Sequence, residues 1–136
     1  MKIIYKDEVP KLEDYINLRK SVNWTVISER NMEISLKSTL YSITANYKDK
    51  FIGMGRIIGD GGYYFIIVDI IVLPEYQGRG IGENIMKSVM NWIKDNCEKS
   101  SAVWLMATKG KEEFYKKFGF ETRPIENHGC GMQLKD

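Results

Sequence analysis

The sequence contains few of the residues that build disulfide frameworks or metal centres. Among its 136 residues there are 2 cysteines and 1 histidine, and Cys97 and Cys130 stand without a CxxC motif or a Cys/His cluster. Isolated cysteines are typical of free thiols in a reducing cytosol. We therefore expect a cytoplasmic protein with no disulfide and no bound metal.

Long apolar runs and an excess of one charge are also missing. No run approaches the ~20 apolar residues that a membrane span needs, and residues 1–5 do not have the form of a signal peptide. The formal net charge of +2 is too small for a dedicated nucleic-acid binder. We expect neither a membrane nor a nucleic acid as partner. A hydrophobic share of 43% in 136 residues predicts one globular domain over residues 1–136.

Apolar periodicity predicts the order of the elements. An initial short strand covers residues 2–5, and helices follow at 11–22 and 28–37, the second capped by Ser28. Later strands are expected at 40–47, 51–58, 63–73 and 102–107, and later helices at 81–96 and 112–118. Residues 120–122 and 131–134 would close the sheet. This order predicts an α/β domain with a mixed sheet, in which an antiparallel meander leads into one strand–loop–helix–strand unit.

A glycine-rich loop lies between the longest apolar run and the longest amphipathic pattern. The run ends at Pro74, and Gly78, Gly80 and Gly82 follow at alternate positions before the helix. Glycine lets an anion approach the backbone closely, and a helix N-terminus adds unpaired N–H donors and a positive dipole end. The loop is therefore predicted to bind a phosphate group.

Two nucleotide-binding motifs do not account for this loop. A Walker A loop requires GxxxxGK[ST], which is absent. A dinucleotide fingerprint has GxGxxG at the strand end and a carboxylate about 20 residues on. Here the glycines are spaced GxGxG, and the next strand ends in Leu105-Met106-Ala107. A ligand-free turn is the structural alternative, but it does not require three spaced glycines.

Two segments resemble the GNAT superfamily of acetyl-CoA-dependent N-acetyltransferases. The stretch from Val72 to Gly82 matches the pattern V-x-P-x-x-[QR]-G-x-G-[IL]-G, and the stretch from Phe114 to Phe120 matches F-Y-x-x-x-G-F. The resemblance is good from Phe51 onward, whereas the N-terminal third agrees only in the order of its elements. It implies a GNAT fold, with a mostly antiparallel sheet whose central strands splay apart between flanking helices.

The resemblance also implies how acetyl-CoA would bind. The pyrophosphate would accept hydrogen bonds from the loop backbone, with Arg79 near its charge. The strand before the loop would carry a bulge and offer its backbone to the pantetheine arm, with Val72 N–H holding the thioester oxygen as an oxyanion donor. The residues expected to contact acetyl-CoA are Ile70, Ile71, Val72, Gln77, Gly78, Arg79, Gly80, Ile81 and Gly82.

The implied reaction is direct transfer of the acetyl group. A neutral amine attacks the thioester carbonyl, and the tetrahedral intermediate collapses to release the CoA thiolate. Tyr115 matches the position of the family's general acid, and a phenol with a pKa of ~10 is protonated at neutral pH. Aromatic packing of the short helix would also account for Tyr115.

Asp69 is a carboxylate inside an apolar run, which is costly unless it is paired. It matches an acidic position of GNAT enzymes that acetylate small polyamines, although those enzymes have a glutamate where this chain has Val68. Asp69 could anchor a cationic amine or accept its proton. The alternative is a buried ion pair, for example with Arg56.

Trp24 follows the first predicted helix, where the family builds its acceptor site. Its ring could stack on a substrate or belong to the core. We expect an acetyltransferase acting on a primary amine of a small molecule, and the resemblance implies that a homodimer is possible. The alternatives are a protein or peptide acetyltransferase, and a module that binds acyl-CoA without turnover as a sensor or partner subunit.

Overall fold

The computed structural model describes residues 1–136, which form two compact units. The first unit comprises Met1–Leu105 and the second comprises Met106–Asp136. The expectation of one domain over residues 1–136 stays a prediction.

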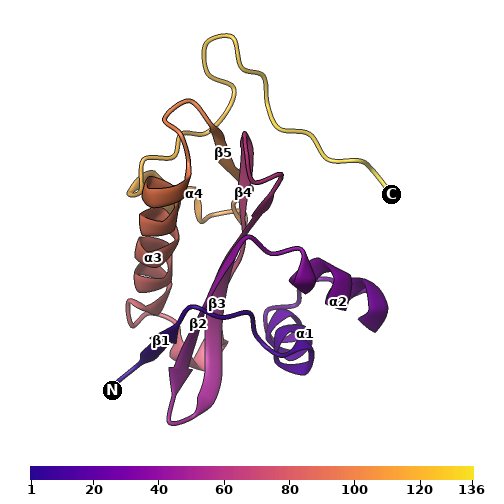
Figure 1. Ribbon diagram of the computed structural model, residues 1–136, viewed down its shortest axis with the longest axis vertical. Coiled ribbons are helices and arrows are strands. Elements are labelled where there is room, and N and C mark those ends of the chain that lie inside the picture. Colours follow the sequence, from indigo (N-terminus) through magenta and orange to yellow (C-terminus); the bar gives the residue numbers. More distant parts are fainter. The chain divides into compact units, whose positions relative to one another are not determined.

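The first unit is a five-stranded sheet with three α-helices (Figure 1). The strand order is β1-β2-β3-β4-β5, with antiparallel neighbours except for the parallel pair β4 and β5. This mixed sheet confirms the predicted α/β class. None of the helices is both long and apolar enough to cross a membrane. The elements are β1 (Ile4–Lys6), α1 (Leu12–Ser21), α2 (Glu29–Lys37), β2 (Tyr41–Tyr47), β3 (Lys50–Gly59), β4 (Tyr64–Val72), a 3-10 turn η1 (Pro74–Tyr76), α3 (Ile81–Asn96) and β5 (Ala102–Leu105).

Local signals in the sequence set several of these boundaries. Ser28 caps α2, because its side chain accepts a hydrogen bond of 3.3 Å from the backbone N–H of Asn31. Lys48 and Asp49 both have positive φ, of 49° and 63°, as a tight hairpin turn between β2 and β3 requires. The cap at Ser28 confirms the sequence prediction, and the turn lies in the gap between the strands expected at 40–47 and 51–58.

The helices cover the sheet on both faces (Figure 1). Helix α3 lies on one face, close to β3, where Gly55 leaves room for it. A Cβ at Gly55 would come within 2.6 Å of a side-chain carbon of Ile85. On the other face, α1 and α2 pack on a core whose buried members come from both helices, β3 and β4. They are Tyr15, Leu18, Met32, Leu36, Met54 and Ile71.

A bulge interrupts β4 in the middle of the sheet. Val68 pairs with Arg56 and Ile71 pairs with Met54, so β4 has two residues where β3 has one. Asp69, within this bulge, has a left-handed φ of 56°, a conformation that aspartate tolerates better than most residues. Phe65 contacts the ring of Trp92 on α3, whereas Ile71 packs under α1 and α2. The extra residue therefore changes which face the odd-numbered side chains of β4 occupy.

The second unit contains the short helix α4 (Glu112–Lys116). Gly119, three residues after its end, has a left-handed φ of 93°, as glycines that follow helices often do. The expected strands at 120–122 and 131–134 do not form, so that prediction was wrong. The only pairing there is an isolated bridge between Ile125 and His128. Short runs broken by Pro124 and flanking glycines offer too few ladder hydrogen bonds to make a strand.

Candidate active site

The second half of β4 has a free backbone edge. Strand β5 pairs with β4 only from Tyr64 to Ile67 and ends at Leu105, while β4 continues to Val72. Within the first unit, residues 68–72 therefore have a neighbouring strand on the β3 side alone. The bulge before the loop is the one that the resemblance implied, and the pairing of β4 with β5 ends just before it.

The direction of the backbone groups follows from the pairing with β3. Leu73 N–H donates a hydrogen bond of 2.8 Å to the carbonyl of Ile52. Because successive residues of a strand point their N–H and C=O groups to opposite sides, those of Val72 point away from β3, towards the free edge. The carbonyl of Val72 accepts a hydrogen bond of 2.9 Å from the side chain of Gln77. This leaves Val72 N–H as a donor at the free edge.

The first glycine of the glycine loop, Gly78, lies six residues after Val72. Gly78 and Gly80 have left-handed φ values of 78° and 80°, with Arg79 between them. Alternating left-handed residues of this kind turn successive backbone N–H groups towards one side, which makes an anion-binding concavity. The N–H of Gln77 donates to the carbonyl of Pro74, so the free donors begin at Gly78 rather than at Gln77. Gly80 and Gly78 would place an added Cβ in open space, which leaves room for a ligand beside the backbone.

Helix α3 adds further donors to the loop. Gly80 is its N-cap and provides no side-chain cap. The first bond within the helix runs from Asn84 N–H to the carbonyl of Gly80, so the N–H groups of Ile81, Gly82 and Glu83 lack a partner within the helix. Together with the helix dipole they make this end favourable for an anion.

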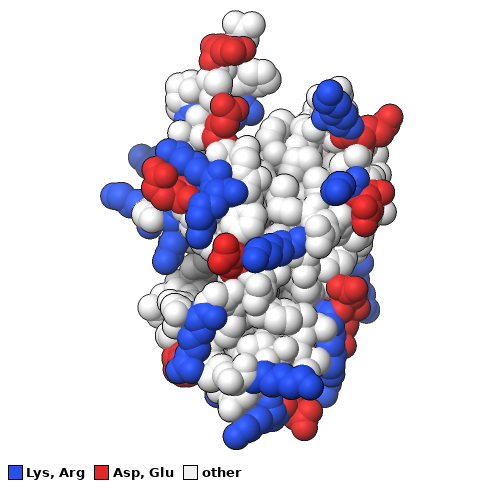
Figure 2. Space-filling view, turned by 90° about the vertical axis from the view of Figure 1, so that its left-hand side faces the viewer, with Lys and Arg blue, Asp and Glu red and all other residues white.

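Arg79 lies exposed between the two left-handed glycines, with its guanidinium 5.9 Å from the centre of the Tyr76 ring. Basic and acidic side chains lie among one another on the face shown in Figure 2, in keeping with the net charge of +2. The positive charge of Arg79 therefore acts locally on the loop.

Asp69 lies at the centre of a buried polar cluster on the α1 side of the sheet. Its carboxylate accepts hydrogen bonds from Arg56 Nε and from the hydroxyl of Tyr15, both of 2.7 Å, and from Arg19 Nη1 at 2.6 Å. The Asp69 side chain is 3% exposed. The ion pair with Arg56, one of the two alternatives from the sequence, is present. A catalytic role for Asp69 stays a prediction.

The two arginines of this cluster differ in how many of their donors are used. Arg56 directs its N–H groups to five acceptors: Asp69, Tyr15 and Thr39 through their side chains, and Ser35 through both its carbonyl and its hydroxyl. Arg19 uses Nε for the carbonyl of Thr25 and Nη1 for Asp69. The cluster therefore holds two guanidinium groups and a single carboxylate.

Sequence reasoning missed Tyr15 and Arg19. Their spacing of four residues on a predicted helix placed them on one face, and that was the available signal. Burial, and next the negative charge of Asp69, raise the pKa of the Tyr15 hydroxyl, so it is a neutral donor to Asp69 at physiological pH.

Trp24, on the loop after α1, is partly buried and packs beside the core under α1 and α2. Its ring centre lies 5.5 Å from the guanidinium carbon of Arg19, a cation–π contact. The structure thus places Trp24 next to the polar cluster, and its contact with a substrate stays a prediction.

Tyr115 belongs to α4 of the second unit. Its ring contacts that of Phe114 edge to face, with ring centres 5.0 Å apart. Tyr115 therefore takes part in aromatic packing within the short helix, which was the structural alternative to an acid role. Burial raises the pKa of its phenol above 10.0, which keeps the proton on the oxygen at neutral pH. The role of Tyr115 as an acid stays a prediction.

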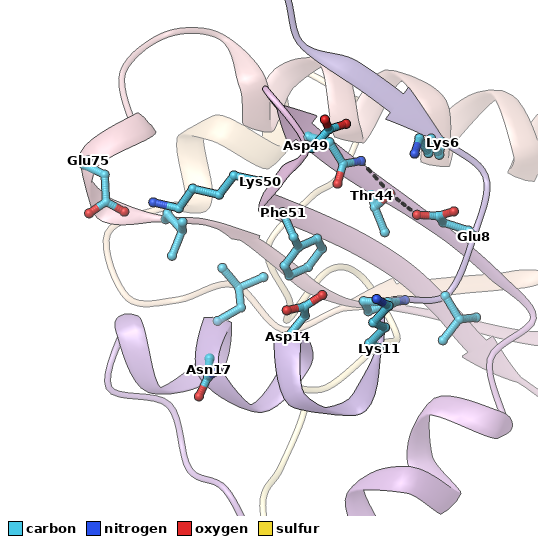
Figure 3. A pocket seen from close by; sticks show the side chains of 15 residues that line it. Lys6, Glu8, Lys11, Asp14, Asn17, Thr44, Asp49, Lys50, Phe51 and Glu75 are labelled. Carbon is cyan, nitrogen blue, oxygen red and sulfur yellow. Dashed lines mark hydrogen bonds between the residues drawn. The ribbon is translucent and has the colours of Figure 1, made fainter.

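A cavity of about 820 Å³ lies between the segment before α1, α1 itself and the hairpin of β2 and β3 (Figure 3). None of the site residues predicted from the sequence lines it. Its wall is mixed in charge, with Lys11 and Lys50 near Asp14 and Glu75. Thr44 in this wall donates a hydrogen bond of 3.1 Å to Glu8.

Known proteins similar to this chain share its fold. The model of the acetyltransferase (GNAT) domain matches residues 38–122. A probable acetyltransferase of unknown function from meticillin-resistant Staphylococcus aureus is 38% identical, with a TM-score of 0.88 over 99% of this chain and 100% of that one. A GNAT family acetyltransferase from Streptococcus pneumoniae TIGR4 is 29% identical, with a TM-score of 0.78 over 99% and 98% of the two chains.

The curated relatives are longer than this chain. An uncharacterized N-acetyltransferase, ycf52, from Pyropia yezoensis is 28% identical over 133 residues, which cover 90% of this chain and 75% of the relative. The corresponding match in Gracilaria tenuistipitata var. liui covers 63% of that relative. The family model spans more than half of the chain, and it agrees with the bulged strand, the glycine loop and the mixed sheet. The chain belongs to the GNAT acetyltransferase family.

Proposed function

We propose that this protein transfers an acetyl group from acetyl-CoA to a primary amine of a small molecule. The observation that carries the proposal is the continuity of two features. The free edge of β4, beyond the bulge at Asp69, leads directly into the glycine loop and the start of α3. One short segment thus offers donors for a thioester at one end and for phosphates at the other.

The phosphate end fits a pyrophosphate. The N–H groups from Gly78 to Gly82 would hold its oxygens, with the charge of Arg79 beside them. Open space next to Gly78 and Gly80 and the absence of a side-chain cap on α3 support this assignment. Gln77 would contribute through its side chain, which fixes the peptide of Val72, more than through its own N–H.

The other end fits the acyl group. Acetyl-CoA supplies a thioester whose carbonyl carbon is attacked by the amine. Val72 N–H, directed to the free edge, would stabilise negative charge that develops on the carbonyl oxygen. Ile70, whose backbone N–H and C=O face the free edge by the same alternation, would flank the pantetheine arm through its backbone. The backbone groups of Ile71 point to β3 instead, so the expected backbone contact of Ile71 is not part of this proposal.

For Asp69 we propose positioning rather than contact with the amine. Three donors already occupy its carboxylate, which leaves little capacity to anchor a cation or accept a proton. By tying β4 to α1 and β3, Asp69 would hold the bulge open. Tyr115 would protonate the departing thiolate, as the family motif supports, and burial keeps its phenol protonated at neutral pH.

Four further expectations stay predictions. They are a small-molecule acceptor, a cytoplasmic location, a homodimer, and the lack of a membrane or nucleic-acid partner. Family relatives support acetyl transfer in general terms.

The proposal is tested by measuring acetyl-CoA-dependent release of free thiol with a panel of primary amines. Binding of acetyl-CoA is measured in parallel by calorimetry. We expect micromolar-range binding and thiol release with at least one small amine. Binding without release on any amine or peptide would instead favour a module that senses acyl-CoA. Absence of binding would overturn the assignment of the loop.

A further inference from the structure

The guanidinium of Arg19 has N–H donors that form no hydrogen bond within the polar cluster. A guanidinium has five N–H donors, and Arg19 directs one to Thr25 and one to Asp69. Its remaining donors have no partner within the first unit. The side chain is 20% exposed, so these donors are reachable from solvent.

The polar cluster also carries one more positive charge than negative charge. Arg56 is 5% exposed and has all its donors occupied. Asp69 is the single acid that pairs with either arginine in the first unit. One positive charge is therefore uncompensated, and it lies on Arg19. A largely buried charge is costly unless an opposite charge completes it.

The orientation of Arg19 is fixed before any ligand arrives. Its guanidinium carbon lies 5.9 Å from the ring centre of Tyr15 and 5.5 Å from that of Trp24, and the bonds to Thr25 and Asp69 hold it from two sides. A planar fork held in this way matches the geometry of a carboxylate or a phosphate, which it can bind through two parallel hydrogen bonds.

We infer that the acceptor amine also carries an anionic group, a carboxylate or a phosphate, and that Arg19 binds it. This inference rests on the proposed function. Arg19 contacts the bulge at Asp69, and Val72 lies three residues further along β4, roughly 10 Å at the usual rise of a strand. The acceptor is therefore a short molecule with its amine at one end and its anion at the other. The same excess of positive charge disfavours polyamines.

The test compares amines that differ only in the anion. γ-Aminobutyrate and ε-aminocaproate are each paired with their own carboxamide, and phosphoethanolamine is paired with ethanolamine. The full chain is assayed for thiol release with each. We expect kcat/KM to be on the order of tenfold or more higher for the anionic member of at least one pair, the usual effect of a hydrogen-bonded charge. The carboxylate and phosphate pairs separate the two sources of the anion.

Two variants assign the preference to Arg19. Arg19→Gln removes the charge, and Arg19→Lys keeps a charge beside Asp69 but loses the planar fork. We expect both to abolish the preference for the anionic member, mainly through KM of the amine, with KM for acetyl-CoA unchanged. Lys20→Gln is the matched control, because it removes the neighbouring exposed charge on the same helix and should leave the preference intact.

The outcomes separate this inference from the proposed function. Equal kcat/KM within every pair, or a preference that survives both Arg19 variants, overturns the inference and leaves acetyl transfer standing. If no amine is turned over, the proposed function fails. Calorimetry of the same pairs in the presence of CoA then decides the inference alone. Tighter binding of an anionic member that depends on Arg19 supports it, and equal or undetectable binding overturns it.

Discussion

Asp69 and Arg56 form an ion pair of 2.7 Å between β4 and β3, at the place where the register of the two strands shifts. Both side chains are almost fully buried. The pair therefore links the bulge of β4 to its neighbour directly. It also connects the bulge to α1 through Tyr15 and Arg19.

Asp69→Asn should destabilise the first unit by roughly 3 kcal/mol, because the buried guanidinium of Arg56 and the partly exposed one of Arg19 lose their carboxylate. Asparagine tolerates the left-handed backbone at this position, so the change tests charge rather than strain. Urea unfolding measures the free energy of unfolding, and kcat should fall with it. Asp95→Asn, on the exposed surface of α3, serves as control. A stability equal to that of the control would contradict the structural role.

Gly80→Val should weaken acetyl-CoA binding at least about tenfold, since it places a branched side chain in the cradle and removes a charged hydrogen bond. The φ of 80° also makes any L side chain costly, by roughly 1–2 kcal/mol. Gly61→Val is a matched control with the same φ of 80° and only one atom within 4 Å. Calorimetry should show weakened binding for Gly80→Val alone. Equal affinities for the two variants would remove the loop from the donor site.

Tyr115→Phe should lower kcat by about a hundredfold or more, the usual contribution of a general acid, with little effect on acetyl-CoA binding. Stopped assays and calorimetry on the same preparation separate the two quantities. Phe114→Leu, which alters the packing partner of Tyr115, distinguishes chemistry from packing. If Tyr115→Phe turned over normally, the phenol would not be the proton donor.

The protein should lose stability as pH rises above about 10. The pKa values of Tyr15, Tyr41 and Tyr115 are all raised above 10.0, in each case chiefly by burial. The unfolded chain therefore releases phenolic protons before the folded chain does, and the free energy of unfolding falls with pH. Below the unfolded pKa both states are protonated and the contribution is complete.

Urea midpoints between about pH 9 and 11 measure this loss, and ultraviolet titration of phenolate follows the folded chain directly. Tyr41→Phe should reduce the slope, since it removes one raised group whose hydroxyl donates to Asp7. Phenolate appearing at the same pH in the folded and unfolded protein would contradict the prediction.

Much of the fold follows from local signals that the sequence carries openly. The cap at Ser28, the hairpin turn at Lys48 and Asp49, and the stripe of α3 are all set by neighbouring residues. The glycine loop was also predictable, because its conformation depends on the φ of Gly78 and Gly80 rather than on distant contacts. The strands expected after Phe118 failed since a strand needs a partner, which a short apolar run does not specify.

The polar cluster and the bulge were harder to predict for a physical reason. The run from Phe65 to Val72 is apolar on both sides, so a one-residue change of face leaves its pattern unaltered. Tyr15 and Arg19 meet Asp69 across sequence separations of 54 and 50 residues. The sequence indicated that Asp69 needed a partner, and Arg56 on the neighbouring strand could be proposed for that reason. The contact with Arg19 could not be predicted in this way.

The hydrogen bond from Gln77 to the carbonyl of Val72 has a consequence for how the donor site works. Gln77, at the start of the loop that would bind the phosphates, also fixes the backbone of Val72, whose N–H would face the thioester. If the loop binds phosphates as proposed, a shift of the loop would be transmitted to the backbone of Val72 through this one amide side chain. Affinity for the donor and the reactivity of its acyl group would then be mechanically coupled.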